Sequence, residues 1–139
     1  PDDVRIGGTA RAYAGAVRDQ LEAEIGQLAA GVAATFGITA SYTFNRRIAP
    51  VINDATATAA ALAAAGAVTG RPVVTDFPPS TAGDDFAEFG SRVPGCYVWL
   101  GNGPAVDGAL HHNSRYDFND DAILTGARYW TALVEQELA

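Results

Sequence analysis

The feature that most limits the possible folds is a single β-α-β pattern at the start of the chain. Residues 4–13 and 38–45 alternate apolar and polar side chains, as half-buried strands do. Between them, residues 14–36 repeat apolar side chains every three or four positions, which predicts a helix that ends at Gly37. The stripe consists of Val17, Leu21, Ile25, Leu28, Val32 and Phe36. Because an isolated two-stranded sheet is only marginally stable in water, this unit is expected to need further strands.

A second region begins near residues 48–52, where the pattern of apolar and polar residues changes. Asn53 or Asp54 is expected to cap an alanine-rich helix that stops at Gly66. Shorter patterns predict buried strands at 73–74 and 96–100, a short helix at 84–89 and a final helix from Asn119. The final helix is expected to pack through Ile123, Ala127, Trp130, Val134 and Leu138. An apolar run such as 96–100 is typical of a strand covered on both faces, so the predicted fold class is α/β.

Composition narrows the possible partners. The 139 residues carry 16 acidic and 9 basic side chains, a net charge of −7, and the basic residues are scattered arginines. Phosphate binding needs clustered cations, so this pattern argues against a nucleic-acid partner. No apolar run reaches the roughly 18 residues typical of a membrane span, and the longest candidates are rich in alanine and glycine rather than leucine and isoleucine. A single cysteine, Cys96, argues against a disulfide framework and favours the cytoplasm. The chain has no methionine, so either processing removed the start residue or the chain is a piece of a longer polypeptide, and the other observations favour a piece.

The loop 101–121 is the richest candidate site, because it follows a predicted buried strand and carries both histidines, His111 and His112. Ligands bind near the carboxyl ends of strands in open α/β sheets. An imidazole there can serve as a metal ligand or as an acid–base group. The alternative is a surface loop whose Asn and Asp side chains form turns and a helix cap. Adjacent histidines in an extended loop point in different directions, so at most one of the pair is expected to be a ligand.

Other residues that could have a functional role also have a purely structural interpretation. Cys96 lies in an apolar run and is expected in the core. A serine triad is disfavoured because the chain has no Gly-x-Ser-x-Gly turn. The segment 83–86 is either a capped helix start or a loop that meets a substrate at the helix N-terminus. Arg46 and Arg47 either solvate a strand end or recognise a carboxylate.

The order of five motifs resembles the C-terminal part of the zinc-dependent amidohydrolases and carboxypeptidases that include hippurate hydrolase and aminoacylase. The motifs are Gly8-Thr9-Ala10-Arg11, Pro50-Val51-Ile52-Asn53-Asp54, Ala82-Gly83-Asp84-Asp85-Phe86, Pro94-Gly95-Cys96-Tyr97-Val98-Trp99-Leu100-Gly101, and His112-Asn113-Ser114-Arg115-Tyr116-Asp117-Phe118-Asn119-Asp120. The resemblance covers essentially the whole chain, and the last motif is the most specific.

The resemblance implies two domains. Residues 1–47 would form half of a ferredoxin-like lid (β-α-β) that mediates homodimerisation. Residues 48–139 would form the C-terminal part of a zinc-peptidase-like α/β catalytic domain. Such a domain holds two divalent metal ions, zinc or manganese, cobalt or nickel. Most ligands and the glutamate base lie in the N-terminal half of these enzymes, so the resemblance puts no catalytic residue in this segment.

The resemblance also implies particular site residues. His112, four positions before Tyr116, falls in register with a metal ligand, and His111 is the alternative. Gly83 and Asp85 correspond to a substrate-facing loop. An arginine that grips a substrate carboxylate in related carboxypeptidases is replaced here by Ala49, and an asparagine of their lid falls on Gly8. These departures favour the hippurate-hydrolase branch and leave the carboxylate anchor unassigned.

The expected function is hydrolysis of the amide bond of N-acyl amino acids (hippurate-like) or related peptides by metal-activated water. The 139 residues are expected to be inactive without the N-terminal half of the protein. The alternative is a non-catalytic dimerisation or ligand-binding module that pairs through the sheet edge at 38–45.

Overall fold

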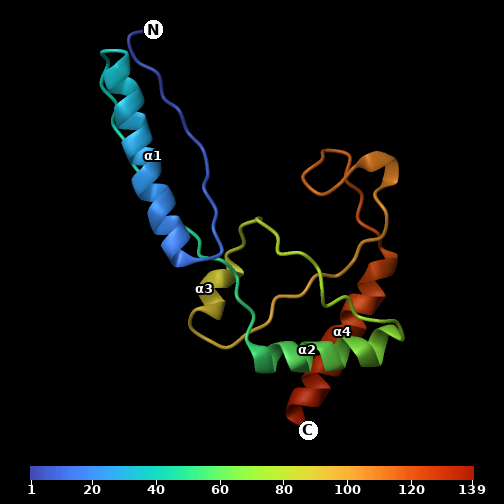
Figure 1. Cartoon of the computed structure of the whole chain (residues 1–139). Helices are drawn as coiled ribbons and strands as arrows, with labels where there is room; N and C mark the ends of the chain where they lie inside the picture. Colours follow the sequence, from blue (N-terminus) through green and yellow to red (C-terminus); the bar gives the residue numbers. More distant parts are fainter. The chain divides into compact units, whose positions relative to one another are not determined.

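The computed structural model describes residues 1–139, with the side chain of Val106 left aside. It contains four α-helices and one short 3₁₀ turn: α1 (Gly15–Thr35), α2 (Ala55–Thr69), α3 (Phe86–Gly90), η1 (Val106–Gly108) and α4 (Asp121–Leu138) (Figure 1). The chain divides into two compact units. The first comprises Pro1–Val51 and Pro79–Phe89, and the second comprises Ile52–Pro78 and Gly90–Ala139. No helix among the described residues has the length and apolar character required to cross a membrane.

The predicted helices are present, with shifted ends. α1 matches the expected helix, and Gly37 takes the left-handed backbone (φ 67°) predicted for its cap. Asp54 caps α2, because its Oδ1 accepts hydrogen bonds from the amides of Thr56 and Ala57, both at 2.9 Å. α2 nevertheless runs past Gly66 and ends at Gly70, which adopts φ 58°. A glycine inside a helix costs only about 1 kcal/mol relative to alanine, so the alanine-rich helix continues through it.

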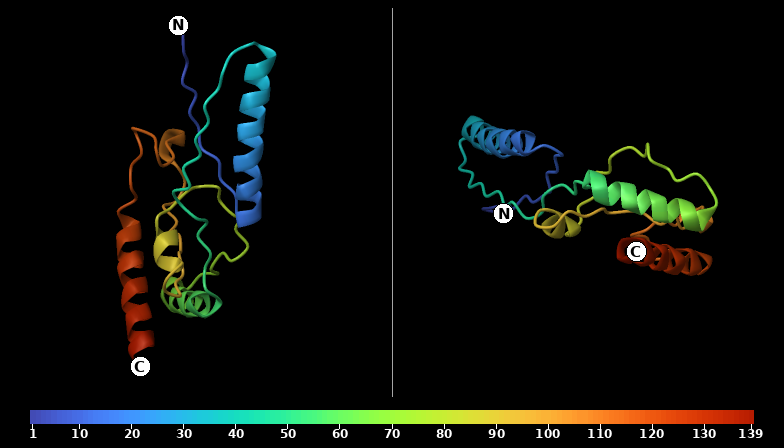
Figure 2. Two further views of the ribbon diagram at one scale, coloured as in Figure 1. Left: turned by 90° about the vertical axis from the view of Figure 1, so that its left-hand side faces the viewer. Right: turned by 90° about the horizontal axis from the view of Figure 1, so that it is seen from below.

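The predicted α/β fold is wrong, because the described residues form no strand or sheet. This correction covers both the β-α-β half of a ferredoxin-like lid and the zinc-peptidase-like α/β sheet. Residues 4–13 and 38–45 flank α1 without helical structure, as the views in Figure 2 show, but have no ladder partner. Ile6 is 93% exposed and Trp99, in the run expected to be covered on both faces, is 60% exposed. Alternation sets which way side chains point, whereas a strand also needs a second backbone to pair with.

In the first unit, residues 38–47 run antiparallel to α1. The ring of Tyr42 lies against Gly26, so close that a Cβ on this glycine would come within 2.9 Å of Cδ1. Nearer the start of α1, the Arg46 guanidinium contacts Asp19 at 2.5 Å and also Glu22. These two bonds raise the pKa of Arg46, Glu22 contributing the larger share. The missing side chain of Gly26 leaves a gap that the ring of Tyr42 occupies. This glycine gap and the ion pairs of Arg46 therefore hold residues 38–47 against α1.

In the second unit, α2 packs against α4 (Figure 1). The contact is made by small side chains, since Ala61 and Ala64 of α2 and Ala122 of α4 are buried. Gln136 Nε2 adds a hydrogen bond to the Ala60 carbonyl at 3.2 Å. The prediction that the apolar stripe of the final helix packs is wrong, because Trp130 and Val134 are more than half exposed. The more buried positions of α4 lie one residue earlier, at Ala122, Gly126 and Tyr129, and Gly126 faces Leu100, whose Cδ2 would lie 3.2 Å from a Cβ there.

The buried side chains of the described residues are all alanines: Ala33, Ala61, Ala64, Ala87, Ala109 and Ala122. Larger apolar side chains are exposed in both units, among them Leu28 (68%) on α1, Phe36 (75%) directly after α1, and Trp130 (61%) on α4. Large apolar side chains exposed in this number are available for contact with another polypeptide.

Candidate functional site

The loop with the two histidines lies between η1 and α4. Both imidazoles are exposed, and their ring centroids are 5.2 Å apart in an edge-to-face arrangement. His112 adopts φ 66°, in the left-handed region that non-glycine residues rarely enter. That backbone costs about 1–2 kcal/mol. Such strain persists only where the surrounding structure determines the conformation, and it is concentrated at functional sites.

Hydrogen bonds from Asn113 organise the next residues of the loop. Its side-chain Oδ1 accepts from the amide of Arg115 at 2.9 Å, and its carbonyl accepts from the amide of Tyr116 at 3.0 Å. Its own amide donates to the carbonyl of Leu110 at 3.1 Å. The loop is therefore a series of tight turns around the histidines. The alternative prediction, a surface loop whose Asn and Asp side chains form turns, describes this backbone correctly.

The base of the loop is closed by Asn102. Its Oδ1 accepts a hydrogen bond from the amide of Asn119 at 2.8 Å, and its Nδ2 donates to the carbonyl of Asp117 at 3.4 Å. Asn119 in turn accepts from the amide of Asp121 at 3.1 Å, at the first residue of α4. The start of the final helix and the end of the histidine loop are thus fixed by one amide side chain.

A similar amide contact lies at the start of α2. Asn53 donates to the carbonyl of Tyr97 at 3.0 Å and accepts from the amide of Tyr97 at 2.9 Å. Beside it, the Asp54 amide donates to the carbonyl of Gly95 at 2.9 Å. Side-chain amides here occupy the backbone groups that a neighbouring strand would otherwise bind.

Cys96, expected in the core, is half-buried. The hydroxyl of Thr58 donates to its Sγ at 3.5 Å. Burial raises the pKa of the nearby Tyr129 phenol, and Cys96 adds a smaller effect in the same direction.

The loop of Gly83 and Asp85 belongs to the first unit. Arg11 lies beside it, since a Cβ on Gly83 would lie 3.4 Å from Arg11 Nε. Tyr13 donates from its hydroxyl to the carbonyl of Pro79 at 2.8 Å. Asp85 is exposed and its carbonyl accepts from the amide of Glu88 at 2.9 Å, in the turn that begins α3.

The sequence singled out the histidine loop and the Gly83 loop as candidates, and it gave no individual role to Arg11 or Asn102. Arg11 was assigned to one face of a strand, and nothing local distinguishes it from Arg5. Asn102 lies between two glycines before a polar loop, which is a recognisable turn signal. Arg46, one of two arginines considered for carboxylate recognition, binds carboxylates of its own chain.

The donor set was tested for its fit to a metal ion. No group of three or more His, Cys, Asp or Glu side chains among the described residues converges as a metal site. A structural or catalytic zinc ion takes three or four protein ligands. The described donors of this chain, His112 among them, therefore do not complete a metal site by themselves.

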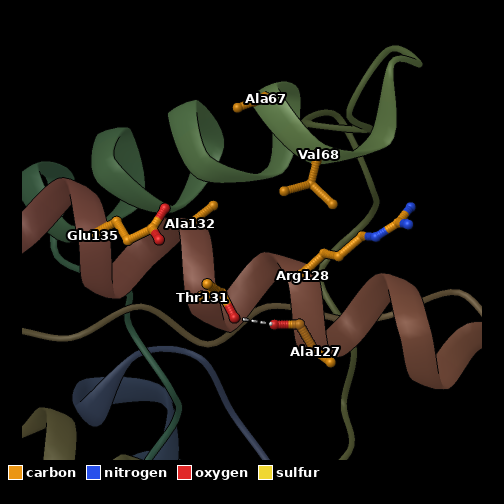
Figure 3. A pocket seen from close by; sticks show the side chains of 7 residues that line it. All are labelled: Ala67, Val68, Ala127, Arg128, Thr131, Ala132 and Glu135. Carbon is orange, nitrogen blue, oxygen red and sulfur yellow. Dashed lines mark hydrogen bonds between the residues drawn. The ribbon is translucent and has the colours of Figure 1, made fainter.

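A separate groove between α2 and α4 carries none of the predicted site residues (Figure 3). It is lined by Ala67, Val68, Ala127, Arg128, Thr131, Ala132 and Glu135. The Thr131 hydroxyl donates to the carbonyl of Ala127 at 3.0 Å, within α4. The groove is therefore a feature of the helix pair rather than of the histidine loop.

Comparison with known proteins gives a consistent result. YhaA of Bacillus subtilis (strain 168), named as an amidohydrolase, is 31% identical over 129 residues, which cover 91% of this chain and 33% of YhaA. The N-acetylcysteine deacetylase of the same organism is 26% identical, covering 96% of this chain and 34% of that enzyme. Thermostable carboxypeptidase 2 of Saccharolobus solfataricus is 23% identical, covering 91% and 32%. No solved structure matches the chain significantly.

The chain spans about a third of the length of these relatives. Residues 4–136, nearly the whole chain, match the family described as Peptidase family M20/M25/M40. The motif order that resembles zinc-dependent amidohydrolases and carboxypeptidases is thereby confirmed, and the chain belongs to peptidase family M20/M25/M40.

Proposed function

We propose that this chain is part of a metal-dependent amidohydrolase that cleaves the amide bond of N-acyl amino acids or related peptides. The observation that carries the proposal is the family match over residues 4–136, with relatives named for amidohydrolase, deacetylase and carboxypeptidase activities. These names share one reaction type, hydrolysis of a carbon–nitrogen bond next to an acyl group. The N-acetylcysteine deacetylase supports an N-acyl amino acid as the substrate class.

His112 is proposed as one metal ligand, with His111 as the alternative. The support is its exposed imidazole and its left-handed backbone, which directs it differently from its neighbour. A pair of bound divalent ions, zinc or manganese, cobalt or nickel, would supply Lewis acidity and a hydroxide-like water at neutral pH. The other ligands and the general base are proposed to come from the remaining two thirds of a family-length protein.

On the substrate side, Gly83 and Asp85 are proposed to face the substrate, with Arg11 as the cation beside them. Gly83 leaves the space that brings Arg11 Nε close to the loop backbone. A guanidinium binds a carboxylate through two parallel hydrogen bonds, so Arg11 suits the carboxylate of an N-acyl amino acid. Arg11 fills the anchor role that the sequence left unassigned.

Residues 48–139 are proposed to belong to the catalytic part and residues 1–47 to a part that mediates homodimerisation. The exposed apolar side chains on both long helices support contacts with further polypeptide. Contact with the remaining two thirds of the protein would cover part of this surface.

The test is a chimera in which this chain replaces the matched 133-residue region of the Bacillus subtilis N-acetylcysteine deacetylase. We expect the chimera to hydrolyse N-acetylcysteine when supplied with zinc, manganese or cobalt, and the 139-residue chain alone to be inactive. His112→Ala should lower kcat/KM by more than the roughly 10–100-fold that loss of a residue orienting a metal ligand produces, because the ligand itself is removed. His111→Ala is the matched control and should lower it far less.

Thermal unfolding and size-exclusion chromatography of each variant separate loss of folding from loss of activity. A folded chimera in which His112→Ala retains full activity would contradict the assignment of His112. A folded but inactive chimera, with a chain that binds partners on its own, would instead support the non-catalytic dimerisation or ligand-binding module.

A further inference from the structure

The side chain of Asn102 bridges two points that enclose the histidine loop. Its Oδ1 accepts from the amide of Asn119 at 2.8 Å, 17 positions along the sequence. Its Nδ2 donates to the carbonyl of Asp117 at 3.4 Å, 15 positions along. Both His111 and His112 lie between these points. Gly103, with φ 84°, follows directly and lies next to the Asn119 side chain, since a Cβ on it would be 3.7 Å from Asn119 Nδ2. The two ends of the loop are therefore tied together at one place.

Closing a loop reduces the number of conformations that its interior residues can adopt. A non-glycine residue in the left-handed region stays there only when its surroundings leave no easier alternative. His112 is such a residue, and the turns around Asn113 continue from it towards the tied end. Releasing the tie would let the loop relax, and His112 could then return to an extended or right-handed backbone that points the imidazole elsewhere.

We propose that Asn102 is a positioning residue for His112: it closes the loop 102–119 and so holds the strained backbone that sets the direction of the imidazole. The inference rests on the proposed function, in which His112 is a metal ligand. Asn102 does not touch the reacting atoms, and its effect passes through the loop backbone.

The chain offers a matched control in Asn53, which makes the same kind of two-bond contact with a backbone, at Tyr97. Asn102→Ala and Asn53→Ala each remove one donor and one acceptor from a similar contact in the same unit. Asn102→Asp keeps an oxygen that can accept from the Asn119 amide, so it is the conservative variant expected to restore part of the function.

The loop itself is probed in the 139-residue chain by amide hydrogen exchange and limited proteolysis. Asn102→Ala should speed exchange of the Asn119 amide by about tenfold, the size of effect that loss of one hydrogen bond produces. It should also speed cleavage within residues 103–118. Asn53→Ala should speed exchange and cleavage only as far as its measured loss of overall stability accounts for. Unchanged exchange and cleavage in Asn102→Ala would overturn the closure of the loop.

The consequence for chemistry is probed in the deacetylase chimera, with kcat and KM for N-acetylcysteine and with the absorption spectrum of bound cobalt. Asn102→Ala should lower kcat about tenfold with little change in KM and alter the cobalt spectrum, as loss of a residue that orients a ligand does. Asn102→Asp should recover part of both, and Asn53→Ala should change neither beyond its effect on unfolding temperature.

The two proposals fail in different ways. Full activity in His112→Ala overturns the proposed role of His112, and the role of Asn102 in catalysis with it. Activity lost in His112→Ala but retained in Asn102→Ala overturns the positioning role alone.

Discussion

In the first unit a long helix lies beside an extended segment, whereas in the second a long helix lies beside another helix. α1 holds residues 38–47 through a ring seated on Gly26 and an arginine between two carboxylates. α4 lies on α2 through buried alanines, and amide side chains fix the flanking loops. The difference teaches that side-chain contacts hold the non-helical segments in both units, with charge and aromatic contact in the first and amide–backbone pairs in the second.

The largest expected effect concerns an amide pair of the second unit. Asn53→Ala leaves the amide and carbonyl of Tyr97 without their side-chain partner, and should lower the free energy of unfolding by about 1–2 kcal/mol. Urea denaturation followed by circular dichroism measures it. Gln20→Ala is the control, because its bond with Glu24 joins two side chains within one helix, whereas Asn53 joins two segments 44 positions apart. Equal losses in both variants would remove the distinction between the two kinds of contact.

The next effect concerns the glycine gap of the first unit. Gly31→Ala has open space within α1 and should stabilise the chain by up to about 1 kcal/mol, since alanine favours a helix over glycine. Gly26→Ala should lose this gain, because its Cβ would come within 2.9 Å of the Tyr42 ring. Denaturant midpoints of the two variants give the comparison. If both variants gained equally, Tyr42 would not be held against α1.

A smaller effect is expected from the ion pairs of Arg46. The pKa of its guanidinium is raised by hydrogen bonds with Glu22 and then Asp19, so the arginine stays charged throughout the accessible pH range. Arg46→Gln should lower the melting temperature slightly at low salt, and the difference from the unchanged chain should shrink as sodium chloride screens the charges. Arg47→Gln controls for the loss of one positive charge. A difference that is independent of salt would argue against an ion-pair contribution.

The smallest effects concern one tyrosine in each unit. Burial raises the pKa of Tyr42 and of Tyr129 above the ordinary 10.0, with smaller effects from Glu22 and Cys96 respectively. The folded chain then holds these protons more tightly than the unfolded chain. Their contribution to stability is complete below pH 10 and is lost as the pH rises through the raised values.

Phenolate absorbance during an alkaline titration measures the two tyrosines, and Tyr42→Phe and Tyr129→Phe each remove one of them. Both variants should show a flatter fall of stability above pH 10 than the unchanged chain. A tyrosine whose removal leaves the alkaline fall unchanged is not held by the contacts described for its unit.

Much of the helical structure could be predicted from local residues. The helix over 14–36, the left-handed Gly37 and the cap at Asp54 all depend on side chains within a few positions, and all are present. The choice of packed face could not be predicted. An apolar stripe shows which side of a helix avoids water, whereas Gly26 and Gly126 mark where a neighbour comes close.

The histidine loop shows the same division. Its position, its two imidazoles and its turn-forming residues were recognised from the sequence, and the role of His112 stays a prediction. The bond from Asn102 to Asn119 links positions 17 apart, so no local pattern could reveal it. Arg11 reaches Gly83 across 72 positions, which only the folded chain brings together.

The sequence by itself determined the presence of the helices, the caps at Gly37 and Asp54, and the family, because these depend on short-range propensity and on the order of motifs. Only the tertiary structure decided that the alternating segments form no sheet, which helix faces are the more buried, and which backbone and carboxylate groups the side chains of Asn53, Asn102 and Arg46 bind. The physical reason is that alternation and propensity act within one segment, whereas pairing needs a second segment at hydrogen-bonding distance.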